Sequence, residues 1–158
     1  MKTRVLFVCL GNICRSTAAE AILRKIDSER ANKLIIESAA VGHWSLGEPP
    51  DPRQMRACGK KEYFFEPQKR AQMIQDEDFK KYDFILAADE QVLQKVKVLQ
   101  PQACSARIEL ITSFSTQFKN KSIPDPYYLG EEAFDLVVTM LEDSCFGLIT
   151  FIDSHTAF

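Results

Sequence analysis

A short apolar segment near the start of the chain runs directly into a compact polar loop, and the loop runs into an amphipathic helix pattern. Val5 to Cys9 is uninterrupted apolar sequence, as expected of a strand buried on both faces of a parallel sheet. From Ser16 to about Ala31, apolar residues recur at helical spacing with charged residues between them. A strand followed closely by such a helix is the first half of a crossover unit, so this order favours an α/β fold.

Strand and helix patterns continue to alternate along the rest of the chain. Further strands are predicted at Leu34 to Val41, at Asp83 to Ala88 and at Arg107 to Leu110. Alternation of this kind is typical of an open parallel sheet whose crossover helices lie on both faces. The prediction is therefore a four-stranded parallel sheet in a three-layer, Rossmann-like α/β fold.

Helix boundaries are indicated by capping residues. Asp51-Pro52 combines a good N-cap with proline at the first helical position. Asp89 is predicted to cap a helix that runs to Leu99, and Pro101 prevents its continuation. A last long helix is predicted to begin near Glu131, where acidic residues suit the positive end of the helix dipole.

Composition limits the classes of function. With 158 residues and 46% hydrophobic content, the chain is expected to form a single domain over residues 1–158. The net charge of -2, without blocks of like charge, gives no reason to expect nucleic acid or membrane as a partner. Five cysteines and no export signal indicate free thiols and a cytoplasmic protein. His43 and His155 lack ligand-like spacing, so neither a metal nor a cofactor is expected.

The loop that follows the first strand carries a Cys-x5-Arg pattern, from Cys9 to Arg15. It lies between a strand and a helix N-terminus, where backbone N–H groups and the helix dipole favour an anion. Positive potential there would hold the Cys9 sulfur as a thiolate. Arg15 supplies a planar fork for two phosphoryl oxygens, and Ser16 is placed to donate a hydrogen bond to the sulfur.

The tight turn that such a loop needs is consistent with Gly11 and Asn12, two residue types that tolerate left-handed backbone geometry. The pattern is nevertheless short. Taken alone, it is equally compatible with Cys9 and Cys14 as two buried core cysteines.

The residues around the pattern favour the catalytic interpretation. The run from Cys9 to Ser16, Cys-Leu-Gly-Asn-Ile-Cys-Arg-Ser, resembles the signature loop of the low-molecular-weight protein tyrosine phosphatase family. The resemblance extends from about Arg4 to about Leu148. Other segments in the family's order and spacing are Ser38 to Val41, Trp44, Pro50 to Arg53, Asp83 to Leu86, Asp89-Glu90 and Asp125 to Tyr128.

The resemblance implies a role for each part of the site. Cys9 would attack phosphorus, Arg15 would hold the phosphoryl oxygens, and Asp125 would act as general acid and base on the leaving group and on water. Proton transfer of this kind is typically worth about 10² to 10⁴ in rate. The implied phosphate-binding loop consists of Leu10, Gly11, Asn12, Ile13, Cys14 and Arg15.

Other residues would support the loop or form the substrate slot. By resemblance, Asn12 and Ser38 form a hydrogen-bonded pair that fixes the loop together with Ser16, and Cys14 is a redox partner that can form a protective disulfide with Cys9. The implied walls of the slot are Ile13, Trp44, Tyr127 and Tyr128.

Ile13 bears on the substrate class. Relatives that act on phosphoarginine resemble this chain but carry threonine at that position, so an apolar Ile13 favours a flat phenyl phosphate. The expected substrates are therefore tyrosine-phosphorylated proteins or small aryl phosphates. The expected state of the enzyme is a monomer.

Three positions depart from the family's pattern. Thr17 stands where proline is usual, which should reduce the stiffness of the first helical turn. Gln68 occupies the position of a histidine that supports the loop asparagine, and Ala88 replaces a methionine. None of these changes affects the three residues with implied catalytic roles.

Other functions fit less well. An arsenate reductase of this fold would need further cysteines after the third strand, and the segment from Asp83 to Val98 contains none. A module that only binds phosphotyrosine would be expected to lack the nucleophile or the acid, and both are present. The phosphate-binding glycine motifs of nucleotide-binding proteins are absent.

Overall fold

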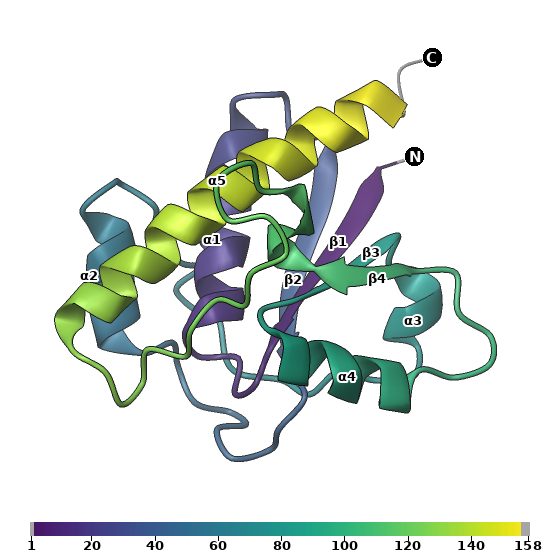
Figure 1. The fold of residues 1–158 in the computed structure, drawn as a ribbon, viewed down its shortest axis with the longest axis horizontal. Helices are drawn as coiled ribbons and strands as arrows, with labels where there is room; N and C mark the ends of the chain where they lie inside the picture. The colour runs from purple at the N-terminus through teal and green to yellow at the C-terminus, as the bar shows by residue number, and fades with distance from the viewer. Residues whose placement is uncertain (1, 156–158) are drawn as a thin grey trace.

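The computed structural model describes residues 2–155, so residue 1 and residues 156–158 of the predicted domain lie outside the described residues. Its centre is a four-stranded, all-parallel sheet, as predicted (Figure 1). The order across the sheet is β2-β1-β3-β4. The strands are β1 (Thr3–Cys9), β2 (Leu34–Ala40), β3 (Phe84–Ala87) and β4 (Arg107–Leu110).

Helices follow or connect the strands. They are α1 (Arg15–Ser28), α2 (Pro52–Gly59), α3 (Asp78–Lys81), α4 (Glu90–Leu99), the 3-10 turn η1 (Ile111–Phe114) and α5 (Glu131–His155). Both predicted caps are confirmed, because Asp51 accepts from the Arg53 N–H at 2.8 Å and Asp89 accepts from the Val92 N–H at 2.7 Å.

Helix α1 ends at Ser28, three residues before the predicted boundary at Ala31. The cause is local backbone geometry, since Ala31 and Asn32 have φ of 70° and 53°, which no right-handed helix accommodates. The buried carboxylate of Asp27 then accepts the backbone N–H groups of Lys33 and Leu34. These bonds turn the chain directly into β2.

The alternation of side chains along β1 divides the interior into two cores. Val5 and Phe7 pack on the side covered by α1, α2 and α5, whereas Leu6 and Val8 pack on the side covered by α3 and α4. The central strand is therefore buried on both faces, as its continuous apolar sequence predicts. Figure 1 shows α5 lying across α1 and α2.

The long helix α5 contains the apolar run from Phe146 to Ile152. Gly147 lies against the backbone of η1, where a Cβ atom would overlap the carbonyl oxygen of Phe114. No helix within residues 2–155 is long and apolar enough to cross a membrane. Because all four strands are parallel, the loops that follow them leave from the same edge of the sheet, and the candidate site forms there.

Candidate active site

The phosphate-binding loop occupies the turn between β1 and α1. Cys9 is the last residue of β1 and Arg15 is the first of α1, so the intervening residues must reverse the chain within one short loop. Asn12 provides the turn, with φ of 60°. Gly11, which tolerates the same geometry, does not adopt it, because its φ is not positive. It lies in the lining of the cleft described below.

The buried sulfur of Cys9 lies among hydrogen-bond donors. The backbone N–H of Asn12 donates to Sγ at 3.2 Å, and the Ser16 hydroxyl lies 3.0 Å from Sγ. The Asn12 side-chain amide donates to Ser16 Oγ at 2.7 Å, so the hydroxyl hydrogen of Ser16 is directed toward the sulfur. Both donors stabilise negative charge on Cys9.

Asn12 is held in this orientation from both sides. Its amide nitrogen also donates to Ser38 Oγ at 2.9 Å, which is the pairing implied by the family resemblance. Its amide oxygen accepts the backbone N–H of Gln72 at 3.0 Å. Gln68, which occupies the position of the family's supporting histidine, is exposed to solvent. The backbone N–H of Gln72, four residues after Gln68, takes this role, and a comparison of side chains could not reveal it.

A buried ionic cluster continues the network behind Ser38. The Ser38 hydroxyl donates to Glu20, a carboxylate on α1 that is almost inaccessible to solvent. Arg24 donates to the other oxygen of Glu20 at 2.9 Å, and Lys69 Nζ lies 3.5 Å from the first. Sequence analysis missed Glu20 and Lys69; the only signal was an acidic residue on the core side of an otherwise apolar helix face.

Arg15 is the largest fully buried polar side chain near the loop, at 2% exposure. Its NH1 nitrogen donates to Asp89 Oδ2 at 2.6 Å and to the Ile123 carbonyl at 2.8 Å. Burial opposes the charge of Arg15, but Cys9 and the Asp89 carboxylate outweigh it and raise the pKa of the guanidinium. Asp89 therefore has two functions, because its second oxygen caps α4. Sequence analysis identified only the cap.

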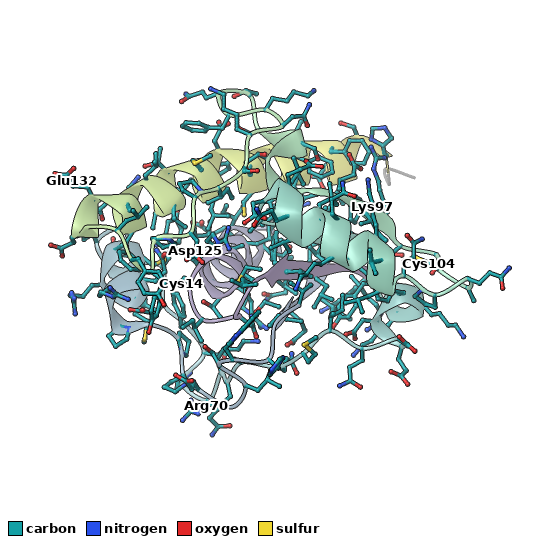
Figure 2. The ribbon with its side chains drawn as sticks, turned by 60° about the horizontal axis from the view of Figure 1, so that its bottom comes forward. Cys14, Arg70, Lys97, Cys104, Asp125 and Glu132 are labelled. Carbon is teal, nitrogen blue, oxygen red and sulfur yellow. The ribbon has the colours of Figure 1, made fainter. Side chains whose placement is uncertain are left out.

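The candidate acid, Asp125, lies on a loop that crosses above this pocket. The loop is fixed on its N-terminal side by the Ile123 N–H, which donates to the Ala88 carbonyl at 2.9 Å. The Asp125 side chain is 43% exposed, and its Oδ2 lies 3.8 Å from Arg15 NH2. Its Oδ1 accepts the Tyr127 N–H at 3.2 Å. In Figure 2, Asp125 lies above Cys14 at the site, whereas the other labelled residues lie toward the outside of the molecule.

Together these segments enclose a cleft of about 390 Å³. It includes the predicted wall residues, the predicted loop residues except the fully buried Asn12, and two residues that were not predicted, Ser45 and Glu48. Its lining residues are Cys9, Leu10, Gly11, Ile13, Cys14, Arg15, Trp44, Ser45, Glu48, Asp125, Tyr127 and Tyr128.

The position of the Trp44 wall depends on a neighbouring glycine. A Cβ atom at Gly42 would overlap the Trp44 ring, so the indole lies directly on the Gly42 backbone. The Gly42 N–H donates to the Leu10 carbonyl at 2.8 Å, which connects this wall to the phosphate-binding loop. The ring also stacks on His43 and lies under the Lys95 ammonium. The wall is thus fixed relative to the floor of the cleft.

Cys14 is the N-cap residue of α1, and Thr17 lies in the first turn of that helix. All five cysteines are free thiols, and burial raises the pKa of Cys14, with the negative charge of Asp51 adding to the effect. Thr17 donates to the Cys14 carbonyl at 3.0 Å. The loss of stiffness expected from the missing proline is therefore offset by a side-chain hydrogen bond. Within residues 2–155, no group of acidic, histidine or cysteine side chains is arranged to hold a metal.

The fold is α/β with a parallel sheet, and one cleft contains a cysteine, an arginine and an anion-binding loop. This combination defines a cysteine-dependent phosphatase. A family model, "Low molecular weight phosphotyrosine protein phosphatase", matches residues 4–157. The pig protein of that name is 39% identical over 145 residues, which cover 89% of this chain and 90% of the relative. The chain therefore belongs to the low molecular weight phosphotyrosine protein phosphatase family, and it is a protein-tyrosine phosphatase.

Solved structures share the whole fold. A protein tyrosine phosphatase from Entamoeba histolytica, with Hepes in its active site, superposes with a TM-score of 0.89 at 32% identity and covers 97% of this chain and 98% of its own. A Drosophila protein described as an arginine phosphatase also gives a TM-score of 0.89, at 28% identity, with 98% and 99% coverage. The fold is thus common to structures named for two different phosphorylated residues.

Proposed function

We propose that the hydrolysis proceeds in two steps through a phosphocysteine on Cys9. In the first step, the Cys9 thiolate attacks phosphorus, the bond between phosphorus and the phenolic oxygen breaks, and protonated Asp125 gives its proton to the departing oxygen. The phosphoryl group is then covalently attached to sulfur, and Asp125 is left as a carboxylate.

In the second step, water attacks the phosphocysteine. The Asp125 carboxylate takes a proton from the water, the phosphorus–sulfur bond breaks, and the electron pair returns to Cys9 as thiolate. Inorganic phosphate leaves the cleft. The Ser16 hydroxyl, 3.0 Å from Sγ, stabilises the thiolate both before attack and as leaving group.

The hydrogen bonds of Arg15 support its role in binding phosphate. NH1 is occupied by Asp89 and by the Ile123 carbonyl, which leaves the Nε and NH2 edge of the fork for two phosphoryl oxygens. The N–H groups of Gly11, Ile13 and Cys14 have no protein acceptor among residues 2–155 and can serve the remaining oxygens. Such preorganised donors are worth most as charge develops in the transition state.

The lining of the cleft favours aryl phosphates, and the proposed substrates are tyrosine-phosphorylated proteins and small aryl phosphates. Ile13 at the floor and the rings of Trp44 and Tyr127 at the sides present apolar surface to a planar leaving group. The Ile13 side chain offers no hydrogen-bond partner to a guanidinium leaving group. Comparable turnover of phosphoarginine and phosphotyrosine by this enzyme would contradict the assignment.

The remaining features concern the state of the protein. We propose a monomeric, single-domain enzyme. Its five free thiols favour a reducing compartment such as the cytoplasm. Cys14 lies beside Cys9 in the lining of the cleft, which supports a reversible disulfide as protection against further oxidation. Catalysis as proposed uses only side chains and backbone amides of the chain.

One observation carries this mechanism: the Cys9 sulfur, the Arg15 guanidinium and the Asp125 carboxylate line one cleft. The test compares the wild type with Cys9→Ser and Asp125→Ala on aryl phosphates. Cys9→Ser should form no phosphoenzyme. Asp125→Ala should react more slowly, and most slowly with poor leaving groups, because they need the proton. Phosphoenzyme formation by Cys9→Ser, or an equal loss for all leaving groups in Asp125→Ala, would disprove the respective role.

A further inference from the structure

A continuous series of contacts connects the phosphate-binding loop to the candidate acid through the start of α2. The Asp51 N–H donates to the Ile13 carbonyl at 2.8 Å. The buried Asp51 carboxylate accepts from Arg53 through both oxygens, from Nε at 3.1 Å and from NH2 at 2.7 Å. Arg53 NH1 donates in turn to the Tyr127 carbonyl at 3.1 Å. Tyr127 N–H then donates to Asp125 Oδ1.

Arg53 is also fixed by packing. Its guanidinium lies over the ring of Tyr127, 5.1 Å from the centroid, and over the ring of Phe134, 4.7 Å from the centroid. The Arg53 hydrogen bond lowers the pKa of Asp51, so the pair is fully charged at neutral pH. A planar fork held by a bidentate carboxylate and two aromatic rings has little freedom to move.

The two ends of the acid loop are anchored differently. On the N-terminal side, Ile123 is held by backbone and by Arg15, as described above. On the C-terminal side, Tyr128 and Leu129 are exposed, and the bond within the loop from the Leu129 N–H to the Pro126 carbonyl is local. Among residues 2–155, the side-chain hydrogen bond that reaches this half of the loop from another element comes from Arg53.

We propose that Arg53 is a positioning residue for the general acid, which sets the place of Asp125 above the phosphate-binding loop. This inference rests on the proposed role of Asp125. The coupling runs through rigid contacts, since Asp51 is fixed both to the loop by its N–H and to α2 as the N-cap. Arg53 itself touches no reacting atom, and its effect is confined to steps that need the proton.

The arginine fork is specifically required. Asp51 occupies the Nε and NH2 edge, and Tyr127 occupies NH1, so both partners are engaged at once. A lysine ammonium is a point charge, so it cannot donate to both oxygens of the Asp51 carboxylate and to the Tyr127 carbonyl at the same time. Arg53→Lys should therefore behave as Arg53→Met does, even though it keeps the positive charge.

The experiment measures kcat/KM for two substrates, 4-nitrophenyl phosphate with a good leaving group and phenyl phosphate with a poor one, in Arg53→Met and Arg53→Lys. Inhibition by inorganic phosphate is measured alongside. We expect kcat/KM for phenyl phosphate to fall about tenfold, which is part of the effect of a general acid, with at most a small change for 4-nitrophenyl phosphate and for phosphate inhibition. Arg56→Met, on the exposed side of the same helix, is the matched control and should leave all three unchanged.

Loss of Arg53 leaves the buried Asp51 carboxylate unpaired, so the double variant Asp51→Asn/Arg53→Met guards against simple unfolding. Asparagine retains the cap, and the double variant should show the same dependence on the leaving group. Equal losses for both substrates, or no loss relative to Arg56→Met, would overturn the proposal. Asp125→Asn separates the two hypotheses: if it shows no dependence on the leaving group, the role of Asp125 fails. If it does and the Arg53 variants do not, only the role of Arg53 fails.

Discussion

The floor and the rim of the cleft are built in opposite ways. At the floor, Cys9, Asn12 and Arg15 are almost fully buried and hydrogen-bonded to one another or to neighbouring side chains. At the rim, Trp44 and Tyr128 are 63% and 92% exposed and are held mainly by ring contacts. The cleft therefore combines a rigid polar base with an exposed aromatic edge.

This difference indicates at which positions a side chain can be replaced without loss of the fold. At the floor, removal of one side chain leaves its partners buried without a hydrogen bond, which costs about 1–3 kcal/mol for each group. At the rim, removal of a side chain exposes surface that water already reaches, so the fold is barely affected. The chemistry is thus expected to depend on the floor, and the choice of substrate on the rim.

The largest effect is expected for Arg15→Lys, a substitution at the floor of the cleft. Lysine keeps the charge but cannot bind Asp89, the Ile123 carbonyl and two phosphoryl oxygens together. We expect kcat to fall about 10²- to 10³-fold, as for loss of a transition-state donor. Steady-state kinetics with 4-nitrophenyl phosphate measures this, and Arg56→Lys is the control. A loss below tenfold would show that charge alone suffices.

Asn12→Ala tests how much stability comes from the hydrogen bonds of the Asn12 side chain and how much is affected by its left-handed backbone geometry. It should lower the free energy of unfolding by about 2–4 kcal/mol, because Ser16, Ser38 and the Gln72 N–H each lose a partner. Asn120 has nearly the same φ, 62°, but lies on an exposed turn. Asn120→Ala should therefore cost only about 1 kcal/mol. Equal losses in urea unfolding would mean that strain, and not the network, is the dominant contribution.

Gly42→Ala is expected to displace the Trp44 wall without disturbing the floor. KM for an aryl phosphate should rise about fivefold, or about 1 kcal/mol of aromatic contact, while inhibition by inorganic phosphate stays the same. Trp44 is the only tryptophan, so its fluorescence reports the displacement directly. Gly59→Ala, where a Cβ meets open space, is the control. Weaker phosphate inhibition in Gly42→Ala would place the change at the floor instead.

The smallest effect is expected at the outermost ring. Tyr128→Ala should raise KM for aryl phosphates only about two- to threefold and leave kcat and thermal stability unchanged, because the side chain is nearly all in water. Phe64→Ala, another exposed ring outside the lining of the cleft, should have no effect on KM. A fall in kcat for Tyr128→Ala would show that the rim takes part in the chemistry.

The order of elements and the cysteine loop could be predicted because they depend on local sequence. The apolar run of β1 is typical of a strand buried on both faces, and the caps at Asp51 and Asp89 follow from short-range hydrogen bonds. The end of α1 was missed because it depends on left-handed geometry at Ala31 and Asn32 and on bonds from Asp27 to residues six and seven positions away. Such bonds have no periodic pattern.

Only the tertiary structure decided which groups complete the site. Asp89 reaches Arg15 across 74 residues, the Gln72 N–H reaches Asn12 across 60, and Arg53 reaches the Tyr127 carbonyl across 74. A sequence records which side chains are capable of such bonds but not which partners the sheet brings within reach. Local sequence thus determined the nucleophile Cys9, the guanidinium of Arg15 and the phosphate-binding loop. The orientation of these groups depends on long-range packing, because the parallel strands bring their loops together at one edge of the sheet.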